Sequence, residues 1–106
     1  MSPLKARRSQ PSLEEICDTL RKHLPQLRAR YGLKSVGLFG SYVRGQRRKE
    51  SDLDILVEFE RPPTLFELMD LEEELEALVG VKVDLVTRKA LRGEVGKRIL
   101  REVIPL

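Results

Sequence analysis

Apolar residues recur at helical spacing in the first third of the chain. Ser12 and Glu15 form the Ser-x-x-Glu pattern of a helix capping box. The spacing that follows predicts an amphipathic helix from about Leu13 to Arg30, ended by Gly32. Pro25 lies inside this helix and is expected to kink it or split it in two. The apolar positions are Leu13, Ile16, Cys17, Leu20, Leu24, Leu27 and Tyr31.

A second helical pattern follows residues 61–63, "RPP", whose prolines are expected to interrupt regular secondary structure. Thr64 and Glu67 repeat the capping box, and the helix is predicted to end at Gly80. A last, basic helix is expected from about Leu91 to Val103. The apolar stripe of the second helix consists of Leu65, Leu68, Leu71, Leu75 and Leu78.

Three short apolar runs are typical of strands. They cover residues 33–39, 53–59 and 81–87, and residues 40–45 between the first two predict a turn into a short helix. The elements then alternate in the order α-β-α-β-α-β-α. This order predicts an α/β (α+β) fold, with a small mixed sheet of three or more strands flanked by helices.

Length and charge indicate how many domains the chain forms and where its net charge lies. A sequence of 106 residues suits one domain, expected over residues 12–106. The net charge is +3, and Lys5, Arg7 and Arg8 near the N-terminus supply three positive charges. Residues 1–11 are therefore expected to form a disordered basic tail, and the remainder is formally neutral. A general nucleic-acid-binding surface is not indicated.

Hydropathy and cysteine usage indicate in which cellular compartment the protein is expected. No apolar run approaches the length of a membrane span, so no membrane association is expected. Cys17 is the single cysteine of the chain, which excludes an internal disulfide and fits a reducing cytosol. A cytoplasmic protein is expected.

Carboxylates interrupt two of the predicted strands. Residues alternate between the two faces of a strand, so Asp52 and Asp54 share one face of the second strand. Asp84 lies in the third strand between two apolar residues. Aspartate is depleted in strands, and an ionised carboxylate in an apolar setting is costly unless it is paired or binds a metal.

Two interpretations of these aspartates are open. In the simpler one, Asp52 caps a turn while Asp54 and Asp84 are solvated. In the other, the three carboxylates bind a metal ion, and oxygen ligands of this kind suit Mg²⁺ or Mn²⁺. One histidine and one cysteine are too few ligands for a zinc-type cluster.

The turn after the first strand carries a second chemical signal. Gly40 and Ser41 open this turn, and such a turn presents backbone N–H groups and a hydroxyl to an anion. Arg44 lies just beyond it and could neutralise a phosphate group. Solvated arginines on a surface loop are the alternative, which we favour for Arg47, Arg48 and Lys49.

Together these motifs resemble a known family. Gly40-Ser41, Arg44-Gly45, the run "SDLDILV" from Ser51 and "VDLV" from Val83 are similar to the nucleotidyltransferase superfamily of DNA polymerase β. More narrowly, they resemble its minimal members, the MNT antitoxins that act beside HEPN-domain toxins. The resemblance covers nearly the whole chain between the first and last predicted helices.

The resemblance implies a fold, a reaction and a set of site residues. Gly40 and Ser41 would hold the phosphates of a nucleotide, with Arg44 nearby. Asp52 and Asp54 would bind Mg²⁺, two ions being expected, and Asp84 would complete the metal site and help to deprotonate the attacking hydroxyl. In the antitoxin group, AMP passes from ATP to a tyrosine hydroxyl of the HEPN-type RNase toxin and silences it.

Other functions stay open at this point. A non-catalytic antitoxin could neutralise its toxin by stoichiometric binding, although three intact aspartates argue against this. A nucleotidyltransferase for a small molecule would normally carry an added helical domain, for which this chain has no room. A nucleic-acid-binding module has support only from the basic tail and scattered arginines, with few aromatic residues for stacking.

Overall fold

The computed structural model describes residues 11–45 and 52–106. Residues 1–10 of the predicted tail, the arginines at 47 and 48, and Lys49 lie outside these ranges. The elements are α2 (Leu13–Tyr31), β1 (Leu33–Phe39), α3 (Ser41–Arg44), β2 (Leu53–Phe59), α4 (Leu65–Val79), β3 (Val83–Thr87), the 3₁₀ helix η1 (Arg88–Ala90), α5 (Gly93–Glu102) and β4 (Ile104–Pro105).

A four-stranded mixed sheet forms the centre of the fold, in the order β3-β2-β1-β4. β1 pairs antiparallel with both β2 and β4, whereas β2 and β3 run parallel. A parallel pair needs a crossover connection, and α4 supplies it. The predicted α/β fold with a small mixed sheet is confirmed.

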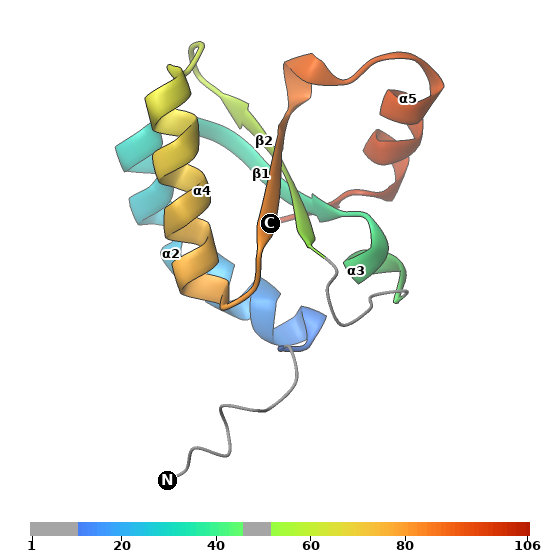
Figure 1. The fold of residues 1–106 in the computed structure, drawn as a ribbon, viewed down its shortest axis with the longest axis horizontal. Coiled ribbons are helices and arrows are strands. Elements are labelled where there is room, and N and C mark those ends of the chain that lie inside the picture. Colours follow the sequence, from blue (N-terminus) through green and yellow to red (C-terminus); the bar gives the residue numbers. More distant parts are fainter. Residues whose placement is uncertain (1–10, 46–51) are drawn as a thin grey trace, which may run out of the picture.

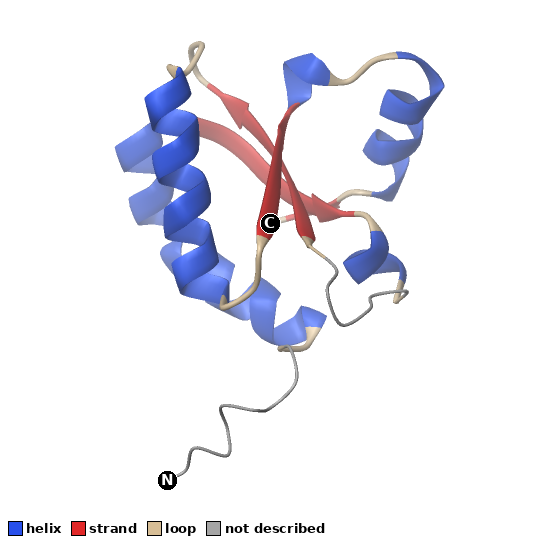
Figure 2. Ribbon diagram, viewed as in Figure 1, coloured by secondary structure: helices blue, strands red, loops and turns tan. Residues whose placement is uncertain are grey.

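Helices α2 and α4 pack against each other and cover one face of the sheet, while α5 lies on the other side (Figure 1). Strand alternation explains the arrangement, because Leu53, Ile55 and Val57 of β2 all point into the core and are fully buried. Cys17 of α2 is also buried in this core. Figure 2 shows the same arrangement with helices and strands in different colours.

Local sequence signals define both long helices. Ser12 and Thr64 each accept a hydrogen bond from the backbone N–H three residues later, and both capping boxes are complete. Gly32 and Gly80 end the helices in the left-handed conformation, where glycine has no Cβ penalty. These helix limits agree with the sequence prediction to within one residue.

Pro25 does not divide helix α2. The helix runs without interruption from Leu13 to Tyr31, with Pro25 exposed. Proline inside a helix removes one backbone hydrogen bond and costs about 3 kcal/mol. Leu24 and Leu27 are buried on either side of it, so packing of the apolar stripe holds both halves of the helix on the sheet. The expected split at Pro25 is therefore wrong.

The C-terminal third differs most from the prediction. β3 begins at Val83 rather than Val81, and a 3₁₀ turn precedes α5, which begins at Gly93 and ends at Glu102. The short strand β4 was not predicted, because two residues, one of them proline, carry no alternating pattern. β4 lies at the sheet edge beside β1, where proline is tolerated.

One surface of α4 is more apolar than the predicted stripe implies. Leu71 and Leu75 are buried, but Leu65 is 68% exposed, so its place on the buried stripe is wrong. Phe66 and Met69 are exposed beside it, at 76% and 52%. The first two turns of α4 therefore carry apolar side chains that the described residues leave exposed. None of the described helices has the length and hydropathy to cross a membrane.

Gly37 allows the C-terminal strand to pack closely on β1. A Cβ atom at this position would lie 2.6 Å from Val103 Cγ2 and 3.1 Å from the Ile104 carbonyl oxygen. Leu106 completes the contact by donating its N–H to the Val36 carbonyl at 2.9 Å. The absence of a side chain at Gly37 thus lets residues 103–106 lie close against β1.

We expect Gly37→Ala to lower the free energy of unfolding by about 1–3 kcal/mol, since overpacking forces Val103 and the β4 backbone to move. Thermal denaturation measures the effect, with Ser35→Ala, at an exposed position of β1, as the control. An unchanged melting temperature for Gly37→Ala would show that β4 is not held by this contact.

Candidate active site

Three segments meet at one end of the sheet. Phe39, the last residue of β1, pairs with Asp54 of β2, so the Gly40-Ser41 turn directly adjoins that aspartate. Asp54 also pairs in register with Asp84 of β3. In Figure 1, α3 lies near the beginning of β2. The structure therefore brings the predicted phosphate turn next to the carboxylates of Asp54 and Asp84 at this end of the sheet.

Asp54 is the half-buried member of the carboxylate group. The pKa of Asp54 is raised to about 6, chiefly by desolvation and then by the charges of Asp84 and Asp52 and a hydrogen bond with Asp84, while the charge of Arg44 opposes the rise. Asp52 and Asp84 are exposed. The site therefore concentrates negative charge around one carboxyl group that binds a proton more tightly than a solvated aspartate does.

Gly40 packs directly on the Asp54 carboxylate. Its φ is +86°, and a Cβ atom built on Gly40 would overlap Asp54 Oδ2. Both the backbone conformation and the space therefore require glycine. This contact joins the phosphate turn and the carboxylate into a single structural unit.

Arg44 is held by a residue that is distant in the sequence. Its Nη1 donates a hydrogen bond to Glu102 Oε1 at 3.0 Å, at the end of α5. The Arg44 side chain is 40% exposed and that of Glu102 25%. Arg44 also acts electrostatically on Asp54, so its guanidinium belongs to the site.

The donor chemistry of the site suits a hard cation. Asp54 and Asp84 are adjacent, Asp52 directly precedes the strand that contains Asp54, and all offer carboxylate oxygens, the ligands that Mg²⁺ prefers. Within residues 11–45 and 52–106, however, no three acidic, histidine or cysteine side chains are grouped closely enough to form a ready-made metal site. The ligand set Asp52, Asp54 and Asp84 stays a prediction.

Family membership follows from comparison with known proteins. Residues 20–106 match the model of the nucleotidyltransferase domain family, which is most of the chain. The chain belongs to the nucleotidyltransferase domain family. Its site residues lie within the matched region, and the predicted resemblance to nucleotidyltransferases is confirmed.

Several relatives are similar to this nucleotidyltransferase over most of their length. Protein adenylyltransferase MntA of Thermococcus cleftensis is 50% identical over 93 residues, which cover 88% of this chain and 94% of the relative. A candidate protein adenylyltransferase of Methanocaldococcus jannaschii is 44% identical, with 86% and 93% covered.

Solved structures agree with the fold. A structure described as a candidate minimal nucleotidyltransferase has a TM-score of 0.76 and 42% identity, and the match covers 91% of this chain and 97% of the other. A mutant of the toxin–antitoxin complex MntA–HpeT has a TM-score of 0.64 and 25% identity, with 92% and 72% covered.

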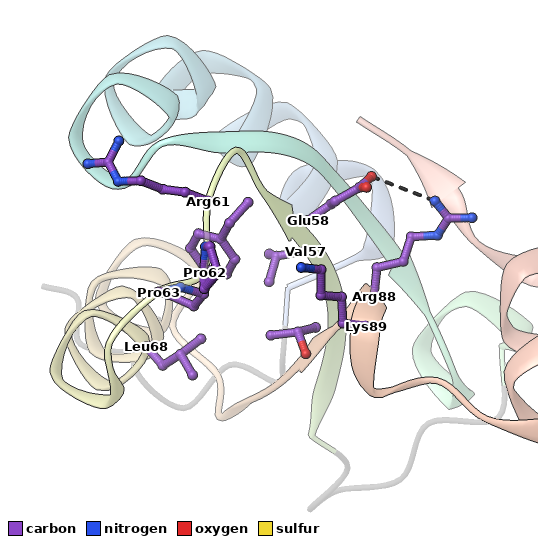
Figure 3. Close-up of a pocket in the computed structure, with 10 residues that line it drawn as sticks. Val57, Glu58, Arg61, Pro62, Pro63, Leu68, Arg88 and Lys89 are labelled. Atoms are coloured by element: carbon purple, nitrogen blue, oxygen red, sulfur yellow. Dashed lines mark ion pairs between the residues drawn. The ribbon is translucent and has the colours of Figure 1, made fainter.

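The nucleotidyltransferase also has a cavity of about 260 Å³ at the other end of β2 and β3. Figure 3 shows Val57 of β2 pointing toward it, with Arg61 and Lys89 at its margins, while Glu58 points to the other side of the strand and forms an ion pair with Arg88. The carboxylates at Asp54 and Asp84 do not line this cavity. A search by cavity shape alone would therefore miss the aspartates.

Glu102 is the site residue that sequence reasoning missed. It lies 58 positions after Arg44, and the sequence gives no periodic or motif signal that joins the two. The one available signal was its place as an acidic residue directly after a basic stretch that contains Lys97, Arg98 and Arg101.

The raised pKa of Asp54 predicts that the folding stability of the metal-free protein depends on pH. The folded state keeps the Asp54 proton up to about pH 6, whereas the unfolded chain loses it near 3.8. The contribution of Asp54 to stability therefore falls as pH rises through this window and is lowest above it. We expect Asp54→Asn to raise the melting temperature in metal-free buffer more at pH 8 than at pH 4.

The control for this measurement is Asp70→Asn, which changes an exposed aspartate on α4. Its effect on the melting temperature should differ little between the two pH values. A stabilisation by Asp54→Asn that is equal at pH 4 and pH 8 would contradict the proposed electrostatic cost.

Proposed function

We propose that this nucleotidyltransferase moves AMP from ATP to a tyrosine hydroxyl of a HEPN-type RNase toxin, with Mg²⁺ as cofactor, and so acts as the antitoxin of that toxin. The observation that carries the proposal is the contact between the Gly40-Ser41 turn and Asp54, in register with Asp84. Identity of 50% to a relative named protein adenylyltransferase MntA supports AMP as the group transferred and a protein as the acceptor.

The nucleotide would be held by the segment between β1 and α3. The Ser41 N–H and hydroxyl can donate hydrogen bonds to phosphate oxygens, and Gly40 lets the phosphates approach the backbone. Arg44 adds a cation beside them, and its planar guanidinium can donate hydrogen bonds to phosphate oxygens. These contacts would orient the triphosphate over the strand ends.

The carboxylates would hold the cofactor and move the proton. Asp52 and Asp54 would bind Mg²⁺ together with Asp84, and the ions, when bound, neutralise charge on the attacking and leaving oxygens. Asp84 would accept the proton of the attacking hydroxyl. That oxygen forms a bond to the α-phosphorus as the bond to the β-phosphate breaks, and pyrophosphate leaves.

A partner protein would also need a surface to contact. The exposed apolar side chains at the beginning of α4, Leu65, Phe66 and Met69, offer such a surface among the described residues. They support a protein acceptor, since an exposed group of apolar side chains is typical of a surface that binds another protein.

The decisive experiment measures the intact mass of the protein encoded next to this one, the candidate toxin, after incubation with this protein, ATP and Mg²⁺. We expect a mass gain of one or more AMP groups on the toxin, lost with Asp52→Asn or Asp54→Asn. Peptide mapping should place the group on tyrosine. Asp70→Asn is the matched control and should retain transfer.

Other outcomes would favour a different function. A tight complex with the toxin but no mass gain would identify a stoichiometric, non-catalytic antitoxin. If Asp54→Asn neutralised the toxin as well as the unchanged protein does, the transferase mechanism would be refuted. Neither complex nor mass gain would point to a small-molecule acceptor.

The role of Arg44 has a separate prediction. Removing a charged hydrogen-bond donor to phosphate costs about 1.5–3 kcal/mol. Arg44→Ala should therefore raise KM for ATP about tenfold or more, measured by steady-state kinetics, and Arg48→Ala should have a smaller effect. Equal effects of the two substitutions would contradict the assignment of Arg44 to the phosphates.

A further inference from the structure

β3 has one paired edge and one open edge. It is the last strand on one side of the sheet, whose order is β3-β2-β1-β4, and β2 is the one described strand that pairs with it. An open strand edge presents backbone N–H and C=O groups that can pair with another chain. The edge of β3 that faces away from β2 is therefore able to accept a further strand.

One hydrogen bond identifies the β3 residues that bond to β2. The Leu53 N–H of β2 donates to the Lys82 carbonyl at 2.8 Å. In an extended strand, the N–H and C=O of one residue point to the same side, and those of the next residue point to the opposite side. Asp84 and Val86 therefore direct their backbone groups to β2, as Lys82 does.

The alternate residues, Val83, Leu85 and Thr87, direct their backbone groups to the open edge. A side chain confirms this direction, because the Val83 N–H donates to Glu76 Oε2 of α4 at 2.9 Å rather than to β2. The Leu85 N–H and C=O and the Thr87 N–H continue the row. These groups are positioned to bond to a strand that lies antiparallel to β3.

An apolar groove of about 380 Å³ adjoins the same edge. Leu65 and Met69 of α4 line one side of it, and Leu85 of β3 lines the other. The Leu85 side chain points to the core face of the sheet, since this residue pairs with the buried Ile55 of β2. An apolar side chain opposite Leu85 in an added strand would therefore enter the groove.

Asp84 lies on the opposite face of β3. Its register partner is Asp54, and side chains alternate between the faces along a strand. In an added antiparallel strand, the residue after the one opposite Leu85 would lie opposite Asp84. The Cβ atoms of such a pair are about 4.5–5.5 Å apart, within reach of an aromatic side chain. One extended segment can thus place an apolar residue in the groove and the next residue beside the carboxylates.

Charges near the ends of β3 discriminate between two occupants. Lys82 and Arg88 lie directly before and after the strand. A second copy of this chain, paired antiparallel about Leu85, would set Lys82 opposite Arg88 at both ends, and like charges opposite each other are destabilising. The exposed pair of Arg88 with Glu58, at 3.7 Å, offsets this repulsion only in part. A segment of another protein with acidic residues at its ends and an apolar centre is the better complement.

We propose that the open edge of β3 binds an extended segment of the acceptor protein as an added antiparallel strand. An apolar residue of the segment fills the groove beside Leu85, and the residue after it presents its hydroxyl beside Asp84. The inference rests on the proposed function for the identity of the occupant, since only that function supplies a protein acceptor. Backbone pairing supplies the affinity, and the groove sets which residue reaches the carboxylates.

The first test follows backbone amide hydrogen exchange by NMR, in the free protein and in its complex with the protein encoded next to it. We expect the Leu85 and Thr87 amides to exchange about tenfold or more slowly in the complex, because they gain hydrogen bonds. Asp84 and Val86 are the internal controls, because their amides already bond to β2. Unchanged exchange at Leu85 and Thr87 in a formed complex, or equal slowing at all four amides, would overturn the inference.

The second test removes one outward donor. Thr87 has a φ of −89°, near the value that proline requires, and its N–H makes no bond to β2. Thr87→Pro should raise KM for the acceptor protein about three- to tenfold, the equivalent of one lost hydrogen bond, with KM for ATP unchanged. Thr87→Val keeps the N–H and should retain both constants. A rise in KM for ATP equal to that for the acceptor would contradict a role in acceptor binding.

The outcomes separate this inference from the proposed function. AMP transfer without protection of the β3 edge would refute the added strand and leave the transferase. Protection of the edge without AMP transfer would refute the transferase and leave the added strand. Absence of a complex would refute both. Protection in the free protein that grows with its concentration would identify a second copy as the occupant and overturn the inference, and should Thr87→Pro unfold, the exchange result decides.

Discussion

The in-register pairing of β2 and β3 is the constraint on which the site depends. Parallel pairing sets Asp54 beside Asp84, and both strands are held by a core that buries the opposite face of β2. Two neighbouring carboxylates repel each other, and burial of Asp54 adds to the cost. The apolar residues Leu53, Ile55 and Val57 hold the strand in place against that repulsion.

Chemistry and scaffold are divided between the two faces of the same strands. One face of β2 supplies the core beneath α2 and α4, and the other carries the carboxylates. A one-residue shift of register would exchange the two faces and destroy both. The contact of Gly40 with Asp54 extends this rigid arrangement to the phosphate turn. Preorganised groups of this kind favour reaction at a fixed position.

Local signals explain why much of the fold could be predicted. Capping boxes and terminal glycines define α2 and α4, and β1 and β2 have the predicted limits because their apolar runs end at glycine or charged residues. Asp52, Asp54 and Asp84 could be selected because aspartate is unusual in strands. The remainder depends on contacts between distant segments, such as β4 with β1 and Glu102 with Arg44, and no local pattern encodes them.

The strand order also has a consequence for biosynthesis. β2 receives its neighbours from opposite directions along the chain, β1 from before it and β3 from after it. A nascent polypeptide that has emerged only as far as α4 contains Gly40, Ser41 and Asp54, but the edge of β2 beside Asp54 is still open. The carboxylate pair exists only after Asp84 has left the ribosome, and Glu102 follows later. The enzyme therefore completes its site only after β3 has been synthesised.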